Sequence, residues 1–174
     1  FEIGTLTIKD SNISVANGVY AGGLPVKPVV VVNVGGKTLV EGTDYELEYG
    51  ANDDRTKVTT TKSLTVKVVG KNGYRTDGTV SKNWGIDKFN LANANVTVDG
   101  DKVTVKCGRV DVETSEYTVE KKDGKVTVTA KKDSKNYTGS KTVDAATQDQ
   151  KPAAPMISSV KVVGNKATAI LSGD

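Results

Sequence analysis

Two acidic clusters lie in turn-like segments and could offer oxygen ligands to a cation. Asn52, Asp53 and Asp54 follow one another in a polar stretch, and Asp99 and Asp101 lie on either side of a glycine. Calcium binds several such oxygens, but neither segment has the spaced acids and distal Glu of an EF-hand loop. Asp and Asn also form turns through local hydrogen bonds, which accounts better for both clusters. We therefore expect no metal site and no cofactor.

Catalytic side chains are scarce in this chain. It contains no histidine, which excludes Ser-His-Asp and Cys-His catalysis and removes the commonest metal ligand. A glycosidase needs two carboxylates held about 5–10 Å apart in a cleft, and no acidic pair here is flanked by cleft aromatics. Gly70-Lys71-Asn72-Gly73 follows a predicted strand but precedes no helix, so it is not a phosphate-binding loop. We expect a protein that is not an enzyme and has no catalytic residues.

Cys107 is the only cysteine, so no internal disulfide and no thiolate zinc site can form. Strand alternation places it on the same face as Val103 and Val105, which predicts a small buried apolar side chain. A lack of cysteine is typical of cytosolic proteins and of Gram-positive surface proteins, so it does not decide the compartment.

The composition favours thin cores and tight turns. Hydrophobic residues make up 36% and aromatic residues 5% of 174 residues, and there are 18 glycines. Many Val/Thr alternations separated by glycine turns predict an all-β protein. The net charge of +3 comes from interspersed charges, whereas nucleic-acid binders carry a clustered basic patch. From this charge distribution we expect no nucleic-acid binding. No apolar window of about 20 residues is present, so we also expect no membrane insertion.

Alternation and turn residues place the strands. We expect strands within 5–9, 12–15, 29–34, 37–40, 44–49, 64–69 and 80–86, and hairpins joining 96–98 to 103–105, 116–120 to 126–130, and 157–163 to 166–171. The nearly continuous apolar run at 29–34 predicts a strand buried on both faces. Gly35-Gly36 predicts a hairpin turn after it, and Pro25 and Pro28 predict an edge or extended approach before it.

The chain also repeats itself. An acidic residue and a tyrosine, an alternating strand and a polar turn with a tyrosine occur around Asp44-Tyr45 and again around Glu116-Tyr117. Phe1-Glu2-Ile3 is similar to Trp84-Gly85-Ile86 at an offset of 86 − 3 = 83 residues. Internal repeats indicate modules in series. We predict one module at 1–86, a shorter one at 87–150, and a linker with the first strands of a further module, or strands that complete the second, at 151–174.

Five segments of the first module, covering about half of the chain, carry a further similarity: Val19-Tyr20-Ala21-Gly22, Val26 to Val31, Gly35 to Tyr45, Val66 to Tyr74 and Gly78 to Lys82. Through these segments the module resembles the β repeats of surface proteins of gut Firmicutes. The tail from Ala154 resembles the opening strands of a fibronectin type III-like domain. The resemblance implies tandem immunoglobulin-like sandwiches in a secreted, cell-wall-attached protein. It departs from the pattern at Trp84, where such repeats usually have Phe, and in a longer polar loop at 52–62.

Two further chemistries were weighed against structural roles. Surface sandwiches of this kind can carry a Lys–Asn or Lys–Asp isopeptide bond, but alternation places Lys9, Lys67 and Lys106 outward. The aromatic side chains could form a sugar-stacking platform, yet several occupy equivalent repeat positions, which favours core or corner roles. They are Tyr20, Tyr45, Tyr49, Tyr74, Trp84, Tyr117 and Tyr137.

The sequence therefore predicts a stalk or adhesion module of a bacterial cell-surface protein. It would be a monomer within a longer chain, and it would act as a spacer or bind host secreted or surface proteins, immunoglobulins among them, or mucus glycans. The alternative is a carbohydrate-binding accessory region of a large secreted glycosidase, which an exposed row of Tyr and Trp on one sheet would favour.

Overall fold

The computed structural model describes residues 5–145 together with the backbone of strands at 156–163 and 166–172. The regular structure in these residues consists of strands, with three-residue 3-10 turns at η1 (Asp10–Asn12), η2 (Leu91–Asn93) and η3 (Thr114–Glu116). The predicted all-β class is confirmed. No helix in the described part of the chain is long and apolar enough to cross a membrane.

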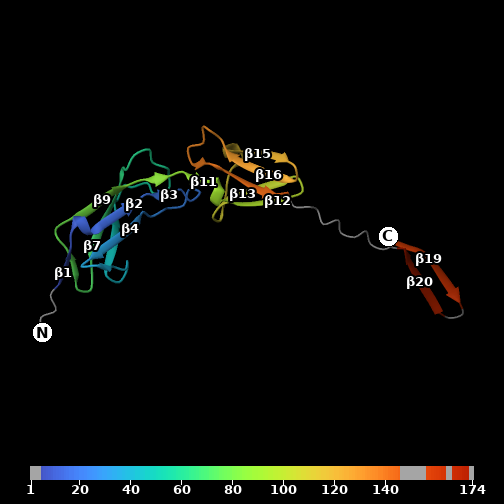
Figure 1. Cartoon of the computed structure of the whole chain (residues 1–174), viewed down its shortest axis with the longest axis horizontal. Coiled ribbons are helices and arrows are strands. Elements are labelled where there is room, and N and C mark those ends of the chain that lie inside the picture. The colour runs from blue at the N-terminus through green and yellow to red at the C-terminus, as the bar shows by residue number, and fades with distance from the viewer. Residues whose placement is uncertain (1–4, 146–155, 164–165, 173–174) are drawn as a thin grey trace.

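The first module contains two three-stranded antiparallel sheets, β2-β4-β5 and β6-β7-β9, and a parallel pair β1-β8 (Figure 1). Short polar or glycine-containing turns join many of these strands. Its strands are β1 (Leu6–Ile8), β2 (Ile13–Ala16), β3 (Gly18–Val19), β4 (Val29–Val34), β5 (Lys37–Thr38), β6 (Tyr45–Tyr49), β7 (Leu64–Gly70), β8 (Tyr74–Thr76), β9 (Val80–Trp84) and β10 (Ile86–Asp87).

The second module repeats this topology. Its sheets are β12-β13-β14 and β15-β16-β18, with a parallel pair β11-β17. The pair Leu6↔Tyr74 in the first module corresponds to Phe89↔Tyr137 in the second, an offset of 89 − 6 = 83 residues at the first strand, equal to the offset between Ile3 and Ile86 in the sequence. Its strands are β11 (Phe89–Asn90), β12 (Asn95–Asp99), β13 (Lys102–Cys107), β14 (Val110–Asp111), β15 (Tyr117–Lys122), β16 (Lys125–Ala130), β17 (Tyr137–Thr138) and β18 (Ser140–Asp144).

Each module has its own apolar core, built mainly from the inward residues of alternating strands. Ile8, Val32 and Val68 are fully buried in the first module, and Leu91 and Val128 in the second. Burying such a side chain contributes about 1.5–3 kcal/mol relative to leaving it in water. A third cluster, around Trp84 and Ile86, lies at the end of the first module that faces the second.

The apolar run of β4 is not buried on both faces, so that prediction was wrong. Val32 and Val34 point into the core, whereas Val29 and Val31 are exposed. The sheet β2-β4-β5 covers the core with one face only, and no described element packs over its outer face. A continuous apolar run therefore did not report burial here.

The predicted hairpins form, with tight turns. Asp123-Gly124 joins β15 to β16 with both residues at positive φ, 51° and 70°, as a two-residue type I′ turn requires. β4 pairs with β5 across Gly35-Gly36, with Val34 opposite Lys37. β19 (Met156–Val163) pairs with β20 (Lys166–Ser172) in a sheet of their own. Phe1-Glu2-Ile3 and most of the predicted linker lie outside the described residues.

Candidate functional site: the junction between the modules

A segment found only in the first module reaches the second. Residues 17–28 lie between β2 and β4, whereas the corresponding β12–β13 turn consists of Gly100 and Asp101 alone. We call residues 17–28 the clamp segment. Its strand β3 pairs in parallel with β10, the connector between the modules. Gly18 N–H donates to Gly85 O at 3.0 Å and Tyr20 N–H to Asp87 O at 2.9 Å. The connector is therefore one strand of a hydrogen-bonded pair.

The half-buried Tyr20 side chain packs against the core of the second module. Its ring meets the ring of Tyr137 edge-on, with centroids 5.5 Å apart and planes at 86°. Phe89 contacts the same Tyr137 ring at 6.4 Å and 82°. Edge-to-face aromatic pairs contribute about 0.5–1.5 kcal/mol beyond the area they bury. A residue of one module thus extends the core of the other by packing against it.

Two further contacts hold the clamp segment. The buried Cys107 thiol donates a hydrogen bond to Tyr20 O at 3.5 Å. Gly22 has a φ of +70°, and a Cβ on it would lie 2.6 Å from Val110 Cβ. Real Cβ atoms do not approach so closely, so the junction closes to this distance only because residue 22 is a glycine.

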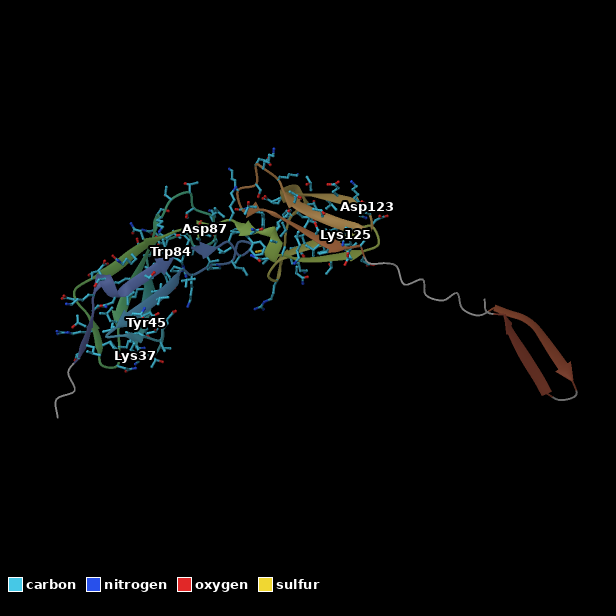
Figure 2. All side chains as sticks on the ribbon, in the orientation of Figure 1. Lys37, Tyr45, Trp84, Asp87, Asp123 and Lys125 are labelled. Atoms are coloured by element: carbon cyan, nitrogen blue, oxygen red, sulfur yellow. The ribbon has the colours of Figure 1, made fainter. Side chains whose placement is uncertain are left out.

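A second segment of the first module, residues 50–63, braces the connector. Thr59 N–H donates to Ile86 O at 3.0 Å, and Ile86 N–H donates to Thr59 Oγ1 at 2.8 Å. This segment also holds the clamp segment, since Val26 N–H donates to Arg55 O at 2.9 Å. The Arg55 guanidinium stacks 4.2 Å from the Tyr49 ring. Both segments that the second module lacks therefore converge on the connector. Figure 2 shows Trp84, just before the connector, and Asp87, within it, at the end of the first module next to the second.

The electrostatics of the junction suit packing rather than acid–base chemistry. Burial raises the pKa of the Tyr20 and Tyr137 phenols and of the Cys107 thiol. All three groups are therefore neutral at physiological pH, and none is poised as a base or nucleophile.

An apolar hollow of about 390 Å³ opens beside the junction. It is lined by residues of both modules, including Val19, Leu24, Phe89, Cys107 and Arg109. Val19 and Leu24 remain half-exposed at its rim. The junction therefore presents some apolar surface to solvent.

The two acidic clusters that were considered as possible calcium ligands, and for which turns were predicted, make hydrogen bonds and ion pairs. Asp53 Oδ2 accepts a hydrogen bond from Thr65 N–H at 2.8 Å. Hydrogen bonds from Lys57 and Thr56 lower the pKa of Asp54 to about 2. Asp101 pairs with Lys121 at 2.9 Å, which lowers its pKa. In the part of the chain described, no three His, Cys, Asp or Glu side chains gather as a metal site would need.

Most of the candidate stacking aromatics lie inside the modules. Trp84 is fully buried, and Tyr45, Tyr117 and Tyr137 are at most 5% exposed. Tyr45 and Tyr117 each begin the equivalent strand, β6 and β15, which confirms the core role predicted from the repeat. Tyr49 lies beneath Arg55, and the Lys37 ammonium lies 5.3 Å from the Tyr74 ring. The described aromatics form no exposed row of the kind that sugar stacking needs.

The lysines considered for an isopeptide bond face outward, as predicted. Lys9 is exposed, Lys67 pairs with Glu48 at 2.9 Å, and Lys106 pairs with Asp111 at 3.0 Å. Cys107 is buried with Val105, also as predicted. What sequence reasoning missed is the partnership of Tyr20 and Gly22 with the second module. The available signal was that residues 17–28 have no counterpart in the second repeat.

Comparisons with known proteins assign this chain to no family. A scan against protein-family models, a search of curated proteins and a search of solved structures each found no match. Function is therefore argued from the geometry of the modules and their junction.

Proposed function

We propose that the chain is a non-enzymatic spacer segment of a bacterial cell-surface protein. In this proposal, small immunoglobulin-like β modules are joined rigidly and hold a more distal binding domain away from the cell. The observation that supports it is the packing of Tyr20 from the first module against the core of the second. The surface location rests on the resemblance of the first module to repeats of such proteins.

Bending at the junction would disrupt several interactions together. The connector would lose the β3-β10 pairing and the Thr59–Ile86 hydrogen bonds, each worth about 0.5–1.5 kcal/mol net. Tyr20 would also leave its contacts with Tyr137 and Cys107. Because these contacts break in the same motion, their energies oppose bending jointly. Such a junction keeps a fixed angle, which is what a spacer needs.

The test is whether the two modules tumble as one body. Backbone ¹⁵N relaxation of the wild-type chain is expected to give one correlation time for residues 5–145. Gly22→Ala should separate the modules and give two, because its Cβ would clash with Val110. Independent tumbling in the wild type would end the proposal.

Gly23→Ala is the matched control for this experiment. Gly23 has a φ of +89°, so alanine is strained at both positions, but at Gly23 the nearest atom is Tyr20 Oη at 3.9 Å. This variant should keep the single correlation time. Separation of the modules by both variants would mean that loop strain, and not the contact with Val110, opens the junction.

Adhesion by these modules themselves is the second part of the proposal. Candidate partners are host secreted or surface proteins, including immunoglobulins, and mucus glycans. Binding of the chain to a glycan array and to a panel of host proteins tests it. Saturable binding that a surface substitution abolishes would identify an adhesin, and no binding on either panel would leave spacing as the function.

A further inference from the structure

The outer face of the sheet β2-β4-β5 carries exposed valines. Val29 is 60%, Val31 39% and Val40 57% exposed. Val31 lies opposite Ser14, and Val29 opposite Ala16. Leu39 N–H donates to Val32 O at 2.8 Å, which continues the β4–β5 pairing to the residue before Val40. We call Val29, Val31 and Val40 the valine face.

The second module shows that its fold does not require this face. Lys102 begins β13 as Val29 begins β4, and Thr104 corresponds to Val31. Leu39 N–H donates to Val32 O in the first module, and Val112 N–H donates to Val105 O in the second. Because Val32 and Val105 are equivalent, the residues that follow the donors, Val40 and Glu113, are equivalent too. The three residues of the second module that correspond to the valine face are all polar: Lys102, Thr104 and Glu113. The same topology therefore forms with a hydrophilic outer face.

The other sheet of the first module is also hydrophilic outside. Its outer face carries the ion pair Lys67–Glu48 at 2.9 Å and an ion pair between Lys71 and Glu46. In the second module, Lys125 pairs with Asp144 across β16 and β18. Compared with these charged and polar sheet faces, the valine face is apolar. Exposed apolar surface that is contiguous and rimmed by polar residues is a feature of interaction sites.

The rim of the valine face is polar and electrically balanced. Lys27 and Glu41, which flank Val29 and Val40 in the chain, pair at 3.3 Å, and both are well exposed. On the other side, Thr38 Oγ1 donates to Asn33 Oδ1 at 2.7 Å. A rim with one base and one acid can face a copy of itself without repulsion, since each base can meet the acid of the partner. A net charge of +3 on the whole chain adds little long-range repulsion.

We propose that the valine face packs against the same face of a second copy of this chain. Two sheets pack face to face about 10 Å apart, with β-branched side chains interdigitating between them. The contact is isologous, so the same patch serves both copies and Lys27 of each can meet Glu41 of the other. This side-by-side pairing of chains goes beyond the proposed spacer function and does not depend on it.

Sedimentation velocity of the full chain over a range of concentrations tests the pairing. The wild type is expected to show a concentration-dependent dimer. The triple variant Val29→Lys, Val31→Thr, Val40→Glu carries the residues that the second module has at these positions, so it should fold normally. Circular dichroism checks that it does. Its association constant should fall at least tenfold.

Two further variants distinguish this face from surface hydrophobicity in general. Val119→Thr changes a comparably exposed valine on β15 and should leave the dimer unchanged. Lys27→Glu should weaken the dimer by placing acids against acids, and Lys27→Glu with Glu41→Lys should restore it.

Three outcomes would overturn the proposal. One is a wild-type chain that stays monomeric at every concentration. Another is a dimer that the triple variant retains. The third is a monomeric chain whose valine face instead binds a protein of the host panel, with that binding lost in the triple variant.

Discussion

The two modules share a topology but differ in what surrounds it. Both have two three-stranded sheets and one parallel pair, with buried residues at matching positions such as Ile8 and Leu91. The first module adds residues 17–28 and 50–63, and both additions reach the connector. The second module replaces them with the tight turns Gly100-Asp101 and Asp123-Gly124.

This difference separates what the fold needs from what has been added to it. The second module shows that neither insertion is required for the sheets to form. The added segments instead join one module to the next, and the valine face likewise has no counterpart in the second module. Residues present in one repeat and absent from the other are therefore the best candidates for function in this chain.

Trp84 offers the largest expected effect. It is fully buried between the core of the first module and the added segments, whereas Ala145 occupies the equivalent register position in the second. Trp84→Ala should destabilise the first module by about 3–5 kcal/mol, because the removed ring leaves a cavity. Urea denaturation followed by circular dichroism measures it. A loss below about 1 kcal/mol would contradict the buried position.

The next test compares equivalent tyrosines. Tyr137 is 5% exposed and contacts Tyr20 and Phe89, whereas Tyr74 is half-buried at the edge of the first core with Lys37 over its ring. We expect Tyr137→Ala to lower the free energy of unfolding by about 3 kcal/mol or more. For Tyr74→Ala we expect about 1 kcal/mol. Equal losses in thermal or urea denaturation would mean that Tyr20 adds nothing to the second core.

Alkaline pH should weaken the junction, where the rings of Tyr20 and Tyr137 meet. Burial raises the pKa of Tyr20 and Tyr137 above the ordinary value of 10.0. Their contribution to stability is therefore complete below pH 10 and is lost as the pH rises through the folded-state pKa. Relaxation measurements above pH 10 should show the modules separating. Tyr137→Phe should reduce this sensitivity, and an unchanged pH profile would count against it.

The smallest effect is expected from removing the C-terminal hairpin. β19 and β20 pair with each other and with no strand of the second module in the described sheets. Truncation after Gln150 should leave the thermal transition of the second module unchanged. A lower transition temperature would instead show that the tail completes this module.

Local pattern was enough for most of the strands. Val/Thr alternation located β7, β12 and β16, and glycine or Asp-Gly turns located the hairpins, because side-chain alternation and turn conformation depend on neighbouring residues. The run 29–34 misled for a related reason. A run of valines predicts a β-strand, but it does not predict which face of the resulting sheet is covered by other parts of the protein.

The junction could not be predicted in this way. Cys107 and Tyr20 are 87 residues apart, and the residues next to each of them in the sequence do not indicate that the two come into contact. The need for glycine at position 22 depends on the placement of Val110, which belongs to the other module.

By itself, the sequence determined the all-β class, most of the strands, the hairpin turns and the repeat, since these follow from periodicity and local backbone preference. Only the tertiary structure decided which outer face stays exposed and how one module closes on the next. Those features depend on contacts between residues far apart in the chain, and such contacts exist only once both modules have folded.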